Sequence, residues 1–214
     1  MRGYRVFATS CDGIGSRLHN AATRGASLLP RGHCRTLAQA GDAPLDRLRQ
    51  DAVVPIRHYY RVTKYDPAQR DADGAYTGEG WTTFEQIGET FGGVRLTLAS
   101  YLDLEARYLV AAAAFFEESG TSRVIAEGVE DVHQTFRVTE GAELSCVGAV
   151  EAVRQMLRGE GWCRLREDDR FYIHVGWDYY LYVGSEQTCE RAVALAEEKG
   201  LFVDRDFPSP YLLG

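Results

Sequence analysis

Residues 162–183 read WCRLREDDRFYIHVGWDYYLYV, and they carry the strongest strand signals in the chain. It holds three runs rich in aromatic and β-branched residues, at 162–166, 170–175 and 179–183, separated by short turns. Such runs predict strands, and turns this short join antiparallel neighbours. We therefore expect an antiparallel meander of three strands here.

The clearest helix lies upstream of this meander, over 98–118. Thr97 is suited to be its N-cap and Gly120 to end it. Apolar residues recur along it at the spacing of one helix face, which predicts that this face packs on the core. The stripe consists of Leu98, Tyr101, Leu102, Leu109, Ala112, Phe115 and Phe116.

The other elements follow from the same signals. Further strands are predicted over 58–65, 122–127 and 201–204, and further helices over 83–89, from Ser145 to near Arg158, and over 189–199. The order along the chain is then β-α-α-β-α-β-β-β-α-β. We predict an α+β fold, in which a mostly antiparallel sheet of five or six strands packs against three long helices.

The first part of the chain differs in composition from the rest. Residues 1–56 hold eight Arg and four Asp but no Lys or Glu, whereas residues 57–214 carry 16 basic and 27 acidic residues, a net charge of −11. Three interpretations fit: an over-extended start, with initiation near Val53 or Val54; an organelle transit peptide; or a disordered arm. We predict a domain over 56–214 preceded by a disordered or non-native extension over 1–55.

The bulk properties also limit partners and chemistry. An acidic domain is a poor binder of duplex nucleic acid, which requires many Lys and Arg contacts. The five cysteines lack CxxC spacing and indicate free thiols in a reducing compartment. No apolar run approaches the roughly 18 residues of a membrane span, and no GxGxxG, GxxxxGK[ST], HExxH or GxSxG motif is present. We expect a cytoplasmic protein with no metal site, no cofactor and no membrane contact.

The hairpin over 170–183 contains the main candidate ligand surface. Strand alternation places Tyr172, His174, Tyr180 and Tyr182 together on the face opposite the apolar residues. One interpretation is an exposed platform for a ligand, since aromatic side chains combine an apolar body with a polar tip. The other is that a helix covers this face and the hydroxyls are hydrogen-bonded at its rim.

A second candidate lies on the first strand. Arg61 and Lys64, with Arg57 and Arg70 nearby, could bind an anion such as a phosphate or a carboxylate. The alternative is an edge strand that its charged residues protect from aggregation.

The sequence offers His174 and Asp178 as its only catalytic candidates. The carboxylate could orient the imidazole for acid–base work, and Cys163 is the one thiol on a neighbouring strand. A lone strand histidine also occurs in a purely structural role.

Several blocks resemble an uncharacterised bacterial family that is frequent in actinomycetes. They are HYYRVTKYDP (58–67), GAYTGEGWTTFEQIG (74–88), WCRL (162–165), FYIHVGWDYYLYVGS (171–185) and GLFVDRDFPSPYL (200–212). The resemblance covers roughly residues 57–213 and implies no activity, cofactor or catalytic residue.

The leading hypothesis is a non-catalytic binding or interaction protein that binds a small ligand or a protein partner through its tyrosine-rich sheet face and the strand that carries Arg61 and Lys64. One narrower form is an inhibitor of a basic partner. The alternative is a small enzyme or binder acting on a nucleotide or RNA phosphate group, with His174 and Asp178 as catalytic groups and Arg61 and Lys64 on the phosphate.

Overall fold

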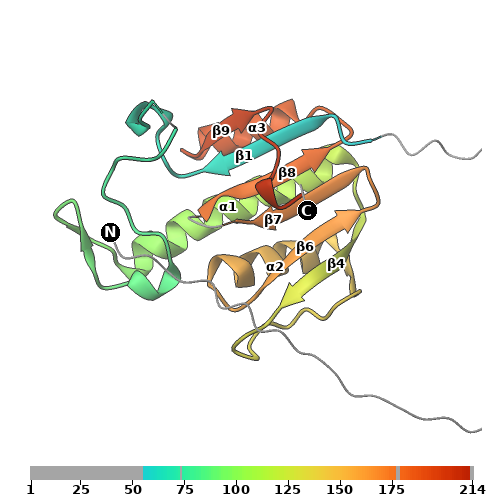
Figure 1. The fold of residues 1–214 in the computed structure, drawn as a ribbon, viewed down its shortest axis with the longest axis horizontal. Coiled ribbons are helices and arrows are strands. Elements are labelled where there is room, and N and C mark those ends of the chain that lie inside the picture. The colour runs from blue at the N-terminus through green and yellow to red at the C-terminus, as the bar shows by residue number, and fades with distance from the viewer. Residues whose placement is uncertain (1–54, 73, 177–178, 213–214) are drawn as a thin grey trace, which may run out of the picture. The chain divides into compact units, whose positions relative to one another are not determined.

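The computed structural model describes residues 55–72, 74–176 and 179–212, and it contains the predicted meander (Figure 1). β6 (Trp162–Glu167), β7 (Phe171–Val175) and β8 (Leu181–Ser185) pair antiparallel in sequence order. His174 lies opposite Tyr182 in this register. The extension predicted over 1–55 and the candidate Asp178 lie outside the described residues, apart from residue 55 itself.

The meander is the middle of a seven-stranded antiparallel sheet with the order β5-β4-β6-β7-β8-β1-β9. The four remaining strands are β1 (His58–Thr63), β4 (Arg123–Glu130), β5 (Glu143–Ser145) and β9 (Phe202–Arg205). β1 therefore lies between β8 and β9, with Arg61 opposite both Tyr182 and Asp204. This position corrects the interpretation of the first strand as a protected edge.

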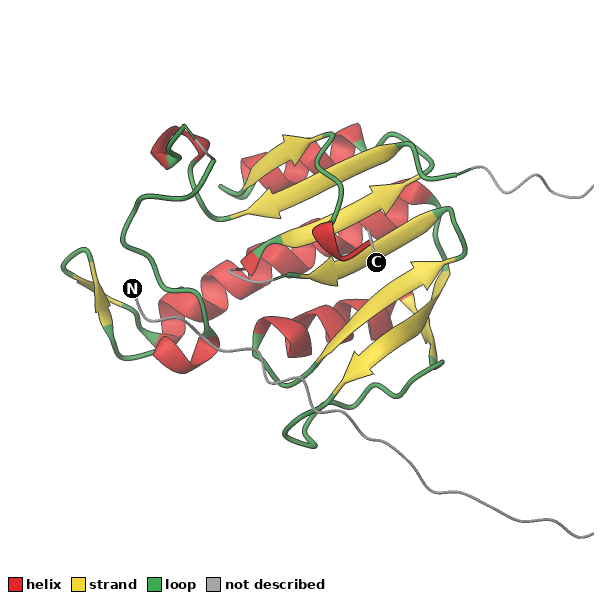
Figure 2. Ribbon diagram, viewed as in Figure 1, coloured by secondary structure: helices red, strands yellow, loops and turns green. Residues whose placement is uncertain are grey.

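Three helices cover one face of the sheet (Figure 2): α1 (Leu98–Ser119), α2 (Cys146–Leu157) and α3 (Glu190–Glu198). The Thr97 side chain accepts a hydrogen bond from the Ser100 backbone N–H, and Gly120 ends α1 with a φ of 73°. Both residues act as predicted, because a left-handed C-cap favours glycine.

Two parts of the predicted order are wrong. The sheet has seven strands and not five or six, because β5, which was not predicted, pairs with β4. The helix predicted over 83–89 is a single 3-10 turn, η2 (Phe84–Gln86), followed by a small hairpin of β2 (Thr90–Phe91) and β3 (Val94–Arg95). Gly88 explains why η2 ends after one turn, since its φ of 102° is positive whereas helical residues have a negative φ.

The core lies between the helices and the sheet, and α1 contributes the largest share of its aromatic residues. Tyr101, Phe115 and Phe116 are buried as predicted, but Leu98 and Leu102 are 53% and 40% exposed. These two leucines occupy the first two turns, to one side of the face that meets the sheet. The predicted stripe was therefore too wide at its N-terminal end.

The opposite face of the sheet is covered differently. After β9 the chain turns back, and the segment 207–212, which ends in the 3-10 turn η4 (Pro210–Leu212), crosses β7 and β8 on this face (Figure 1). Among the described residues, no helix is long and apolar enough to cross a membrane.

Candidate functional site

The predicted tyrosine-rich face forms a stack of three rings. His174 lies between Tyr172 and Tyr182, at centroid distances of 5.9 and 5.4 Å and interplanar angles of 26° and 25°. All three side chains are at most 5% exposed, whereas Tyr180 is half-buried. The residues are thus brought together as predicted, but three of the four do not present a surface to solvent.

Two glycines create the room for this stack. Gly184 lies opposite Tyr172 across the hairpin, and a Cβ added there would be 2.1 Å from the Tyr172 ring. A Cβ on Gly176 would likewise be 2.6 Å from the ring of Tyr182. The rings therefore lie flat over bare backbone, which allows them to be buried without pushing the sheet apart.

The covering element is the C-terminal segment and not a helix. The Ser209 hydroxyl lies 2.8 Å from His174 Nε2, and the Ser209 backbone N–H donates to the Tyr172 hydroxyl at 3.3 Å. The ring of Tyr211 meets His174 edge-on at 5.5 Å. Polar tips of the stack thus hold the segment 207–212 in place.

His174 and Ser209 have the contact of a base and a nucleophile, but both side chains are fully buried. The Ser209 hydroxyl also accepts a hydrogen bond from the Tyr211 backbone N–H, at 3.1 Å. Burial lowers the pKa of His174 to about 4, and the positive charge of Arg164 acts in the same direction. No substrate reaches this pair while the segment is in place.

Cys163, the candidate thiol, faces the helix side of the sheet and is fully buried. Burial raises the pKa of its thiol to about 12, which leaves it un-ionised and unreactive at neutral pH.

The structure separates Arg61 from Lys64. Arg61 Nε donates to Asp204 at 2.9 Å, and Arg70 binds the same carboxylate through two hydrogen bonds of 2.9 and 2.8 Å. Burial opposes ionisation of Asp204, but the hydrogen bonds from both arginines outweigh it and hold its pKa below the ordinary value. The anion that these arginines bind is therefore part of the protein.

Lys64 lies on the helix side, where its ammonium group donates to the Trp81 carbonyl. The same group sits 3.7 Å from the centroid of the Trp81 ring. Neither the predicted joint anion site nor a shared surface is formed by Arg61 and Lys64.

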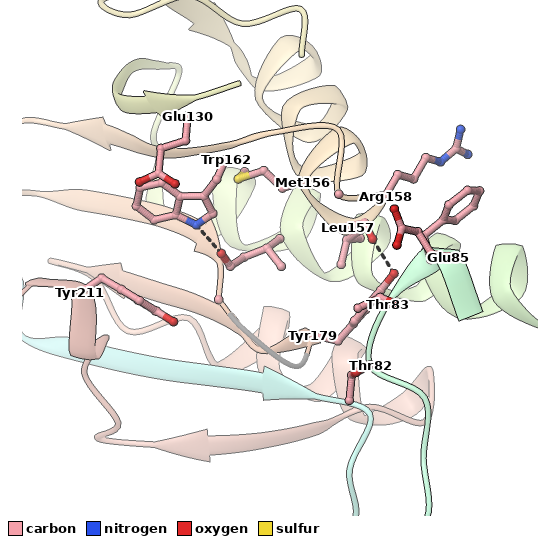
Figure 3. A pocket seen from close by; sticks show the side chains of 14 residues that line it. Thr82, Thr83, Glu85, Glu130, Met156, Leu157, Arg158, Trp162, Tyr179 and Tyr211 are labelled. Carbon is pink, nitrogen blue, oxygen red and sulfur yellow. Dashed lines mark hydrogen bonds between the residues drawn. The ribbon is translucent and has the colours of Figure 1, made fainter. Parts of the chain in front are cut away.

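A pocket of about 410 Å³ adjoins the C-terminal segment, and sequence reasoning missed it (Figure 3). Its walls come from η2, the ends of β4, α2 and β7, the start of β6, and η4. The apolar wall residues are Phe84, Met156, Leu157, Trp162, Val175, Tyr179 and Tyr211. No local pattern predicts the pocket, because its walls are assembled from segments far apart in the chain.

Two of the aromatic walls, Trp162 and Tyr179, have their polar atoms hydrogen-bonded within the protein. Trp162 Nε1 donates to the Val175 carbonyl at 2.6 Å, and the Tyr179 hydroxyl donates to the Leu157 carbonyl. Figure 3 shows both bonds bordering the pocket. Tyr179 adopts a φ of 61°, which is uncommon for a residue with a side chain and is found at functional sites.

The basic and acidic side chains at the rim of the pocket differ in whether they form ion pairs. Arg158 forms a bidentate ion pair with the buried carboxylate of Glu105, at 2.7 and 2.8 Å. Glu85 and Glu130 are exposed, line the pocket and have no ion pair among the residues described by the structure. Figure 3 shows them at opposite ends of the labelled group, Glu130 beside Trp162.

No protein-family model, no curated protein and no solved structure matches this chain. Within the described ranges, no group of three or more His, Cys, Asp or Glu side chains is arranged to hold a metal ion.

Proposed function

We propose that this protein is a non-catalytic binding protein whose ligand occupies the pocket beside η2 and η4. One observation carries the proposal: a cavity of about 410 Å³ has aromatic walls, and the polar atoms of Trp162 and Tyr179 among them are already paired. Binding pockets in proteins are of this size and are lined in this way, with few polar groups at the rim.

The tyrosine-rich face has a supporting role in this proposal. The stack of Tyr172, His174 and Tyr182 anchors Ser209, and Ser209 in turn positions Tyr211 as a pocket wall. The proposed ligand site is therefore the pocket, and not the stacked aromatic face that the sequence suggested. The stack contributes by holding one wall of the pocket in place.

The enzymatic alternative has less support. It requires an accessible His174 and a phosphate site shared by Arg61 and Lys64. His174 is fully buried, Arg61 is bound to Asp204, and Lys64 lies on the other face of the sheet.

The chain offers a reporter for the pocket, since its only methionines are Met1 and Met156. With methyl-labelled methionine, titration with toluene and n-pentanol is expected to shift the Met156 methyl resonance in a saturable way and to leave Met1 unchanged. Met156→Leu assigns the signal.

Two variants separate the pocket from non-specific binding. Thr83→Trp adds a bulky side chain at the pocket wall and should abolish the shift. Val147→Trp adds the same side chain on the exposed face of α2 and should leave the shift intact. A Met156 signal that no probe moves would contradict the proposal.

A further inference from the structure

Resting on the proposed function, we infer that the pocket selects a cation, an ammonium or guanidinium group on an apolar stem. The observations are its aromatic walls, two rim carboxylates without an ion pair among the described residues, and the pairing of Arg158, the one basic residue of the described lining. None of these alone defines a ligand, but all three favour the same chemistry.

The first step concerns the positive charge. Arg158 is the only basic residue among the described residues that line the pocket. The Nε and Nη2 atoms of its guanidinium both donate to Glu105, whose carboxylate balances its charge. In Figure 3 its side chain points away from the centre of the pocket. Among the described lining residues, an anionic ligand would therefore find no cation without a carboxylate partner.

The second step concerns the negative charge. Glu85 and Glu130 flank the cavity with no ion pair in the described part of the chain, and residues 57–214 together carry a net charge of −11. An excess of one sign at a cleft attracts ligands of the opposite sign. Exposed carboxylates alone bind weakly, so the walls must supply the remaining affinity.

The third step concerns the walls. Trp162 donates its N–H to a backbone carbonyl, as the Tyr179 hydroxyl also does, so what these residues offer a ligand is chiefly ring surface. The face of an aromatic ring attracts cations, and tryptophan attracts them most strongly. The protein uses the same interaction internally, where Arg61 lies 3.5 Å from the centroid of the Phe207 ring.

The test compares three probes with the same apolar stem: n-pentylammonium, n-pentanol and pentanoate. At low ionic strength the Met156 methyl should report about fivefold tighter binding of the ammonium than of the alcohol. Pentanoate should bind more weakly than either.

The carboxylates are tested with Glu85→Gln combined with Glu130→Gln, both exposed positions that leave the core intact. The preference for the ammonium over the alcohol should disappear. It should persist in the control Glu197→Gln, which removes a charge from the exposed side of α3.

A capped peptide with one central arginine, and the same peptide with citrulline, distinguish the source of the cation. Tighter, carboxylate-dependent binding of the arginine peptide identifies a protein side chain as the ligand; tighter binding of the free amine identifies a small molecule.

Equal affinity for ammonium and alcohol, with Met156 responding to both, would overturn the inference and leave the proposed function standing. A Met156 signal that responds to no probe would overturn both.

Discussion

Acidification should destabilise this protein through one side chain, His174. Its pKa is about 4 in the folded protein, because the ring is buried, and about 6.5 in an unfolded chain. The unfolded state therefore binds the proton first. The stability that depends on neutral His174 is complete above pH 6.5, falls as the pH drops toward 4, and falls no further below that.

The size of the effect follows from the two pKa values. Between pH 7 and pH 5 the free energy of unfolding should decrease by about 2 kcal/mol, and the total loss by pH 4 and below approaches about 3 kcal/mol. The window from pH 6.5 to 5 lies above the ordinary range of carboxylates, so Asp and Glu contribute little there.

Urea denaturation at pH 7, 6 and 5, followed by tryptophan fluorescence, measures this slope. His174→Phe should flatten it, whereas His133→Gln, at an exposed position, should leave it unchanged. The reasoning is refuted if the native protein shows no slope, or if the slope survives in His174→Phe.

Three further substitutions have expected outcomes in the same denaturation assay. Asp204→Asn leaves two buried guanidinium groups without their carboxylate and should cost about 3 kcal/mol, while Glu143→Gln, at an exposed pair, should cost less than about 1 kcal/mol. Gly184→Ala forces a Cβ into an aromatic ring and should cost about 1–3 kcal/mol; Gly148→Ala, in a helix with ordinary space around it, should be neutral or stabilising. Ser209→Ala removes the partner of a buried imidazole and should cost about 1–2 kcal/mol, and an unchanged stability would show that the C-terminal segment is held by other contacts.

The elements that could be predicted from the sequence are those with local signals. The meander is marked by strand runs and short turns, and α1 by Thr97 and Gly120. The helix predicted over 83–89 is only the 3-10 turn η2, because the chain turns at Gly88 before a second helical turn can form. β5 was missed because its three residues carry no pattern.

The candidate site could be predicted only in part, because most of its contacts join residues far apart in the chain. Strand alternation groups Tyr172, His174 and Tyr182 correctly, because it is a property of neighbouring residues. The group is covered by Ser209, and Arg61 binds the carboxylate of Asp204. Both partners lie near the other end of the chain. Contacts at such separations leave no trace in a local pattern.

The position of β1 between β8 and β9 has a consequence for how the protein is made. A strand near the start of the described chain finds both of its partners close to the end of it. During synthesis β1 cannot pair with its first partner until β8 has left the ribosome, and the hydrogen-bonding groups of its other edge stay unpaired until β9 follows. Newly made chains therefore pass through a stage with an open strand edge, at which capture by a chaperone, or pairing with another nascent chain, competes with folding.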